Sequence, residues 1–205
     1  IRKASANVNL AVKSKSTNSV NHLVGAAILA NLASFFQIFL LIGPLNPKWL
    51  MAIIPSILVM IITAGFLAIY YFKRKEPDTS TAPPEEKKSE QIFSLLPALK
   101  FAGLLIIIKI VTKICLILFG KSGFIISSVL ASFAGIDAIV VNLADMAGHT
   151  ITFKFAFVTF LIINATNLLS KSGYSYLQGD RRFAMRFFLA MVIVIAASAV
   201  GLMFF

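Results

Sequence analysis

Cysteine and acidic residues are both scarce in this 205-residue chain. The single cysteine, Cys115, lies in an apolar segment, which excludes a disulfide framework or a multi-cysteine metal site within one chain. Charged residues make up 13% of the sequence and hydrophobic residues 59%, a balance that an ordinary soluble domain could not present to water. The composition therefore predicts an integral membrane protein.

Motifs of soluble enzymes are also absent. The sequence has no Gly-rich phosphate-binding loop, no HExxH and no Gly-x-Ser-x-Gly. Asp137 and Asp145 are the only carboxylates for an intramembrane aspartyl pair, but both fall in one predicted helix, whereas a dyad needs carboxylates from different elements. Two aspartates without a histidine between them are also a weak metal signal. We therefore expect no enzyme activity, no metal site and no cofactor.

Positive charge is in excess, with 19 Lys and Arg against 8 Asp and Glu. The basic residues gather at the ends of apolar runs, which is typical of topology signals and of contact with anionic headgroups rather than nucleic acid. We expect the lipid bilayer to be the main partner and nucleic acid not to be one. Homo-oligomerisation stays open.

The apolar runs predict an all-α, polytopic bundle of about six transmembrane helices. A basic lead-in at 1–19, expected on the cytoplasmic side, precedes two helices within 20–72. A charged, flexible loop at 73–90 separates them from four helices within 91–205. The expected spans are Val20–Ile42, Leu50–Phe72, Ile92–Leu118, Ser122–Gly148, Ile151–Leu169 and Phe183–Phe205. Trp49, in the turn before the second span, stands where interfacial aromatic residues are common.

The distribution of lysine and arginine favours both chain termini on the cytoplasmic side. In that arrangement the basic cluster between Lys171 and Arg186 lies outside, against the rule. The cluster would move inside if 122–148 were a re-entrant hairpin broken at Ala134–Gly135. Because re-entrant backbone must be buried in protein, the continuous span is the main prediction and the hairpin the alternative.

A short pattern occurs twice, as AILANLAS at Ala27–Ser34 and as AIVVNLAD at Ala138–Asp145. If it marks an internal repeat, the chain would consist of two inverted three-helix halves, an arrangement that places sites near the midplane in secondary transporters. Chance similarity in sequence rich in Ala, Ile and Leu is the alternative.

The segment 122–148 carries Asp137, Asn142 and Asp145 within an apolar run. A charged group at such depth costs about 2.5–3.5 kcal/mol on insertion scales, so it normally faces a partner or a watery cavity. Other polar residues share helix faces on neighbouring spans. The predicted substrate or ion pathway consists of Asp137, Asn142, Asp145, Asn164, Asn167, Lys171, Lys109, Lys113 and Asn31.

In the predicted polar core the two aspartates neutralise Lys109 and Lys113, and the asparagines complete the hydrogen bonds. The alternative is that these side chains only hold helices together, as polar side chains do in membranes. Lys113 could also extend its ammonium group to the interface. Asn31 and Gln37 on the first span are expected to form interhelical hydrogen bonds.

Three stretches resemble a bacterial and archaeal membrane family, the domain of unknown function 4010. They are Ser132–Ile139, the set Thr166, Asn167, Lys171 and Gly173, and the basic turn Gly179–Arg182. The family's first aspartate stands as Gly135 here, so only Asp137 carries over.

The resemblance implies a multi-pass protein of the bacterial or archaeal cytoplasmic membrane. The family commonly follows an MgtC/SapB-type domain, so the resemblance also implies such a domain before this chain as a partner. The start at Ile1 rather than Met fits that expectation, and the polar residues that follow lack the apolar core of a secretory leader.

Two functions fit the sequence. The first is transporter-like movement of a small ion or polar solute through the Asp, Asn and Lys core. The second is a non-transporting membrane module that scaffolds or regulates a partner. The sequence does not determine the substrate, the direction of transport or the coupling ion.

Overall fold

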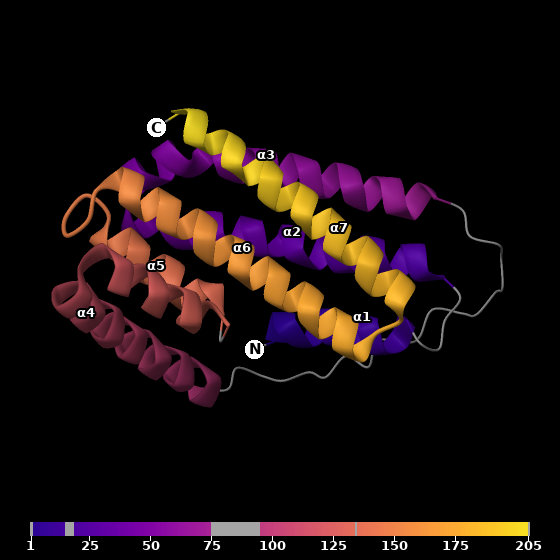
Figure 1. Ribbon diagram of the computed structural model, residues 1–205, viewed down its shortest axis with the longest axis horizontal. Coiled ribbons are helices and arrows are strands. Elements are labelled where there is room, and N and C mark those ends of the chain that lie inside the picture. The colour runs from indigo at the N-terminus through magenta and orange to yellow at the C-terminus, as the bar shows by residue number, and fades with distance from the viewer. Residues whose placement is uncertain (1, 15–18, 75–94, 134, 205) are drawn as a thin grey trace.

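A computed structural model describes residues 2–14, 19–74, 95–133 and 135–204 of the chain (Figure 1). Most of the predicted loop at 73–90 lies outside the described residues. Within these ranges the chain is helical and forms no β-strand, so the all-α prediction is confirmed. The elements are α1 (Arg2–Ser14), α2 (Val20–Leu45), α3 (Pro47–Lys73), α4 (Leu95–Ser132), α5 (Ile136–Met146), α6 (Phe153–Gln178), α7 (Arg181–Ser198) and a 3₁₀ helix (Ala199–Phe204).

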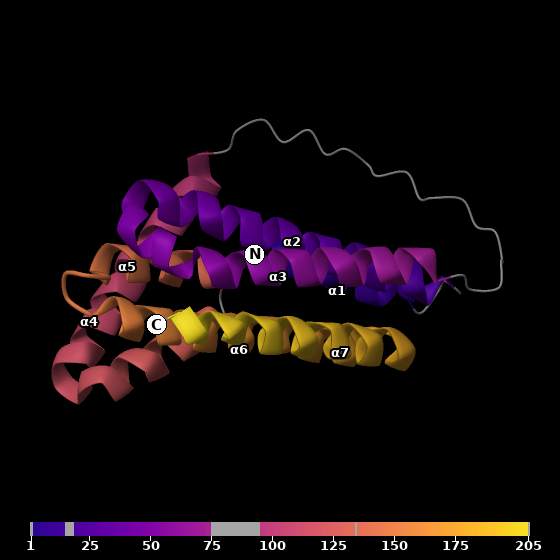
Figure 2. The same ribbon diagram turned by 90° about the horizontal axis from the view of Figure 1, so that it is seen from above.

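The long helices form two layers. Figure 2 shows α2 and α3 in one layer and α6 and α7 in the other, with α4 and α5 gathered at one end. In the lead-in, residues 2–14 form the helix α1, which packs against α2 and α6. Its Ser14 hydroxyl accepts a hydrogen bond of 2.9 Å from the backbone N–H of Asp180, so α1 is tied to the turn between α6 and α7.

Five helices in the described part of the chain are long and apolar enough to cross a membrane. By length and composition they are Val20–Leu45, Pro47–Lys73, Ala102–Ser132, Phe153–Gln178 and Arg181–Met203, and the third of them contains a kink at Gly120. Five candidates among these residues are close to the expected count of about six. The difference lies in 92–148, where the expected third and fourth spans are replaced by α4 and the short α5.

Asn46 makes the sharp turn between α2 and α3. Its side chain accepts a 2.9 Å hydrogen bond from the N–H of Trp49, which caps α3. Its amide nitrogen donates to the carbonyls of Ala144 and Ala147 at the end of α5, at 3.0 and 2.8 Å. Trp49 lies in this turn but faces inward, fully buried, and its ring meets that of Phe160 edge-on.

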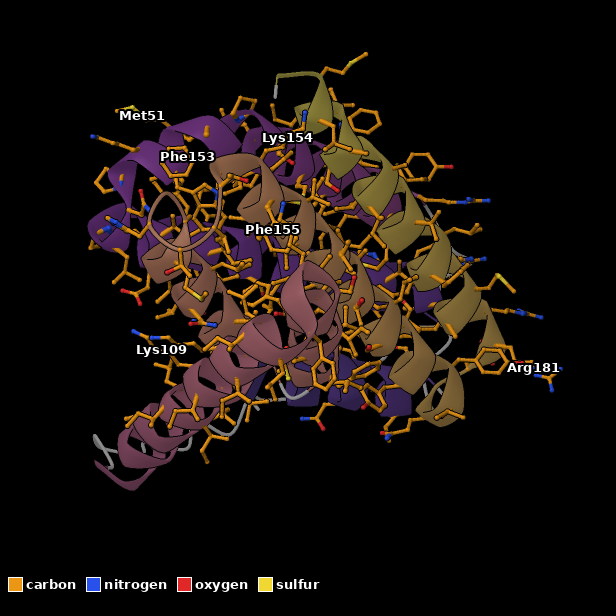
Figure 3. The ribbon with its side chains drawn as sticks, turned by 60° about the vertical axis from the view of Figure 1, so that its left-hand side comes forward. Met51, Lys109, Phe153, Lys154, Phe155 and Arg181 are labelled. Atoms are coloured by element: carbon orange, nitrogen blue, oxygen red, sulfur yellow. The ribbon has the colours of Figure 1, made fainter. Side chains whose placement is uncertain are left out.

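Gly120 reverses the direction of the chain inside α4. Its φ of 63° and ψ of −152° divide α4 into residues 95–119 and 121–132. The second part returns close to the first, because a Cβ at Gly123 would lie 2.5 Å from the Cys115 carbonyl oxygen. The first part is the rose helix that extends away from the bundle in Figure 3.

The chain is interrupted again between α4 and α5. Gly135, with φ 149° and ψ 143°, precedes the first turn of α5. Asp137 in that turn lies beside Gln37 of α2, and Ala147 after α5 lies beside Asn46, so α5 runs parallel to the second half of α2. The helix therefore starts within the bundle and ends at the α2–α3 turn.

Residues 121–148 enter and leave at the same end of the bundle. Lys121 and Phe124 at the start of this stretch both contact the ring of Phe155, next to the loop that follows α5. The prediction of one continuous span over 122–148 is wrong, and the alternative hairpin describes the fold of the described residues, with its break between Ser132 and Ile136. The physical reason is the glycine backbone at Gly120 and Gly135, which no pattern of apolar residues reveals.

The hairpin changes two further expectations. Figure 1 shows the C-terminus near the end of the bundle that holds the α2–α3 turn, whereas α1 lies along the other half of the bundle, toward the α6–α7 turn, so α1 and the C-terminus do not lie at the same end. The two copies of the short pattern also lie in helices that run in the same direction, α2 and α5, whereas inverted repeats would oppose them. The proposed inverted repeat is therefore not the basis of the fold.

Gly135→Ala is expected to lower the free energy of unfolding by about 1–3 kcal/mol, because φ near 149° is a conformation that residues with a Cβ rarely adopt. No atom lies within 4 Å of where the Cβ would be, so the cost comes from the backbone alone. Detergent unfolding followed by far-UV circular dichroism measures it.

Gly173→Ala is the matched control for that measurement. Gly173 is helical, exposed and also without an atom within 4 Å of a Cβ. The same substitution should here raise stability by about 0.5–1 kcal/mol. Equal effects at the two glycines would contradict the assigned backbone at Gly135.

Candidate functional site

The interruption before α5 brings Asp137 to the side of α2. The Gln37 amide nitrogen donates to the Asp137 carboxylate at 3.3 Å, and the carboxylate is half-buried. Gln37 stands eight residues before the end of α2, so this contact lies about 12 Å inside that end of the bundle. Asp137 occupies the first turn of α5, where exposed backbone N–H groups favour a negative charge.

Asn142 lies about one and a half turns further along α5 and is buried. Its amide nitrogen donates to the hydroxyl of Thr112 on α4 at 2.8 Å, and that hydroxyl donates to the Ile108 carbonyl at 2.7 Å. The amide oxygen of Asn142 has no hydrogen-bond partner among the described residues. A buried acceptor of this kind normally has a water molecule or an ion as its partner.

Lys109 on α4 and Asp145 on α5 form an ion pair, with Nζ and Oδ2 2.5 Å apart. Both side chains are about half exposed, at 55% and 51%, so the pair lies on the outer side of these two helices. Lys113 is exposed on the same helix. The predicted neutralisation of two lysines by two aspartates is therefore found for Lys109 and Asp145 only, because Asp137 faces α2 instead of α4.

The predicted stripe on α6 faces α2 and α3. Lys171 is 8% exposed, and its ammonium group donates to the Asn31 amide oxygen on α2 at 2.9 Å. Asn164 donates to the Met60 sulfur on α3 at 3.2 Å, while its amide oxygen has no partner among the described residues. Asn167 is buried between these two positions.

The predicted residues therefore form two groups. Asp137, Asn142, Asp145 and Lys109 gather around α5, and Asn31, Asn164, Asn167 and Lys171 gather around α6, with Lys113 in neither group. The helix α2 joins the groups, because Asn31 and Gln37 stand less than two turns apart along it.

Thr112 and Met60 were not expected among the polar contacts. The sequence does not show that the Thr112 hydroxyl accepts a hydrogen bond from the distant Asn142. It also does not show that the Met60 sulfur accepts one from Asn164. Spacing alone could have placed Thr112 one turn from Lys109, on the face of α4 that meets α5.

The described residues contain no group of three or more His, Cys, Asp or Glu side chains that could hold a metal ion. The polar groups that remain are amide oxygens, one half-buried carboxylate and one buried ammonium. This chemistry suits hydrogen bonding to a small polar solute, or weak and reversible contact with a hard cation.

A family described as a domain of unknown function (DUF4010) matches residues 5–179 of the chain. The match covers α1 to α6 and so includes both groups of polar residues. No curated protein and no solved structure matches the chain.

Proposed function

The chain belongs to the DUF4010 family, and we propose that it is a transporter-like, multi-pass protein of the bacterial or archaeal cytoplasmic membrane that moves a small ion or polar solute. The observation that carries this proposal is the break between α4 and α5, with a carboxylate on the first turn of the half-helix that follows. Irregular backbone at membrane depth is tolerated only where it is buried in protein or lines a watery cavity.

Broken helices of this kind form binding sites in many secondary transporters, where the ends of half-helices and polar side chains replace the water around a solute. In this chain Asp137 supplies the charge at such an end, and Gln37 orients its carboxylate. The buried amide oxygens of Asn142 and Asn164 supply acceptors that no described residue uses. Asn31, Asn167 and Lys171 extend the pathway along α6, and Lys109 with Asp145 closes its outer side.

The test is an uptake assay with the purified chain in proteoliposomes, over a panel of monovalent and divalent cations and amino acids. Asp137→Asn keeps the size of the side chain and its contact with Gln37 but removes the charge. We expect it to reduce uptake about tenfold or more, which corresponds to ~1.4 kcal/mol in the barrier.

Asp180→Asn is the matched control. Asp180 caps α7 at the opposite end of the bundle, and asparagine is an equally good cap, so the fold and the uptake should both be kept. If the wild-type chain moves nothing across the panel, or if both variants lose uptake equally, the transporter proposal is wrong.

A second candidate function rests on α4. In the most apolar stretch of α4 only 11% of the residues are buried, whereas 33–44% are buried in the corresponding stretches of the other candidate spans. The helix α4 therefore offers an apolar face to a neighbour in the membrane. A non-transporting module that scaffolds an MgtC/SapB-type domain would use such a face. Co-purification of that domain with the chain, lost when exposed residues such as Ile117 are replaced by polar ones, would favour this function.

A further inference from the structure

Both ends of the bundle carry basic side chains, and one end carries more of them. One end holds the α2–α3 turn, the reversal at Gly120 and the loop 147–152, with Lys48, Lys121 and Lys154. The other holds the end of α3 and the α6–α7 turn, and it carries Lys73, Arg74, Arg181, Arg182 and Arg186. Figure 3 shows Arg181 at this second end, far from Met51 and Lys154 near the first.

Asp180 is the acidic residue that the structure describes at this basic end. Its carboxylate accepts a 2.8 Å hydrogen bond from the backbone N–H of Arg182 and caps α7. The Asp180 carboxylate is therefore already hydrogen-bonded to the backbone at the start of α7. Among the described residues this end therefore has an excess of positive charge, which attracts anions at short range.

A groove of about 520 Å³ lies at this end along the last turns of α3. Phe66, Ile69, Tyr70, Lys73 and Arg74 line it. Phe66 is 70% exposed and Ile69 56%, so its apolar part opens outward, toward the lipid in a chain that spans the membrane. Its rim is cationic.

Asn21 links Arg74, which lines the groove, to Arg186 on the neighbouring helix α7. Asn21 of α2 donates to the Arg74 carbonyl at 3.2 Å and accepts from the Arg186 guanidinium at 2.6 Å. The Tyr71 hydroxyl donates to the Arg186 carbonyl at 3.4 Å.

The Arg74 side chain itself turns toward Tyr70. Its guanidinium donates to the Tyr70 hydroxyl at 3.3 Å and lies 6.0 Å from the centre of that ring. The hydrogen bond to Tyr70 uses one of the five N–H donors that a guanidinium has, so the group can donate to a further acceptor.

We propose that this groove binds one anionic phospholipid, with the phosphate at Lys73 and Arg74 and an acyl chain along Phe66 and Ile69. The order of residues along α3 matches the order of groups in such a lipid: apolar side chains first, then the aromatic hydroxyl, then the cations. Residues 66 to 74 span about 12 Å of helix, which suits the passage from hydrocarbon to headgroup. Arginine and lysine both bind phosphate, arginine through paired donors.

The proposal also orients the chain. Anionic lipids and excess lysine and arginine both mark the cytoplasmic side of a membrane. The end with α1, the α6–α7 turn and the groove would therefore face the cytoplasm, and the C-terminus would lie on the other side.

The test is native mass spectrometry of the full chain, purified from mixed micelles with equal amounts of phosphatidylglycerol and phosphatidylcholine. We expect one phosphatidylglycerol to be retained preferentially. In Lys73→Gln/Arg74→Gln its retention should fall about fivefold for each charge removed. Lys48→Gln/Lys154→Gln removes two exposed charges at the other end and should retain the lipid as the wild type does.

Two further measurements separate this site from general charge and from misfolding. Lys73→Arg/Arg74→Lys keeps both charges and should retain phosphatidylglycerol, while far-UV circular dichroism checks that each variant is folded. Inorganic phosphate, added as a competitor, should not displace the lipid, because it lacks the acyl chain. Absence of a preference for phosphatidylglycerol, equal losses in the two glutamine variants, or displacement by phosphate would each overturn the proposal.

Discussion

Trp49→Ala is expected to lower the free energy of unfolding by about 3–5 kcal/mol, the usual cost of removing a fully buried tryptophan. The ring lies in the α2–α3 turn against Phe160 of α6, at 6.4 Å between ring centres. Without it, this end of the bundle would contain a cavity, and the surrounding side chains would lose dispersion contacts that lipid does not replace. Unfolding in detergent, followed by far-UV circular dichroism, is the measurement.

Two controls separate the effect of losing the Trp49 ring from the effect of losing its indole nitrogen and from that of any substitution near this turn. The Trp49 indole nitrogen is buried and has no hydrogen-bond partner among the described residues, so Trp49→Phe loses packing volume but no hydrogen bond. We expect it to cost clearly less than the alanine variant. Met51→Ala changes a side chain that is 73% exposed and should be close to neutral. A small effect of Trp49→Ala would show that the turn is not packed as described.

Asn31→Leu is expected to be the second most damaging substitution, with a loss of about 1.5–3 kcal/mol. Leucine is similar in size to asparagine but removes the amide oxygen that accepts the 2.9 Å hydrogen bond from Lys171. Both side chains are buried, at 1% and 8% exposure, so water cannot fully replace the lost acceptor.

Lys171→Met completes a double-mutant cycle. Methionine keeps an unbranched side chain of similar length and removes the charge, so the single variant should be milder than Asn31→Leu. In the double variant Asn31→Leu/Lys171→Met, neither a charge nor its acceptor is left, and the effects should be non-additive by about 0.5–3 kcal/mol. Purely additive effects would show that the two side chains do not interact.

The same variants also separate a structural role from a role in transport. If Lys171 only holds α2 and α6 together, the double variant should regain both the stability and the uptake that the single variant Asn31→Leu has lost. If Lys171 lies on the pathway, the double variant should regain stability while uptake stays low, because the ammonium group is absent. The comparison does not depend on knowing the transported solute, since any substrate from the proteoliposome panel can be used.

The sequence predicted the individual helices better than their connections. Residues 20–45, 47–73 and 153–178 form helices where apolar runs of about 20 residues indicated spans, because such length and composition depend on local sequence alone. The region 92–148 was harder. Gly120 and Gly135 lie in sequence as apolar as that of the other spans. No local feature of the sequence distinguishes a glycine that continues a helix from one with positive φ.

The candidate site shows a similar division. Residue types and spacing identified Asn142, Lys171 and Asn31, which are buried, and Asp137, which is half-buried. The prediction that Asp137 neutralises a lysine was wrong, since Gln37 is its partner, 100 residues away in the chain. Periodicity gives the face of a helix on which a side chain lies but not which helix that face meets.

By itself, the amino-acid sequence determined that this is a helical membrane protein and which of its side chains are too polar to face lipid. These properties follow from length, composition and helical period, which act over a few turns. Only the tertiary structure decided that 121–148 folds back on itself, that α5 lies parallel to α2, and which polar groups meet. Those outcomes depend on backbone reversals at two glycines and on contacts such as that of Lys171 with Asn31, 140 residues apart, which helix packing selects.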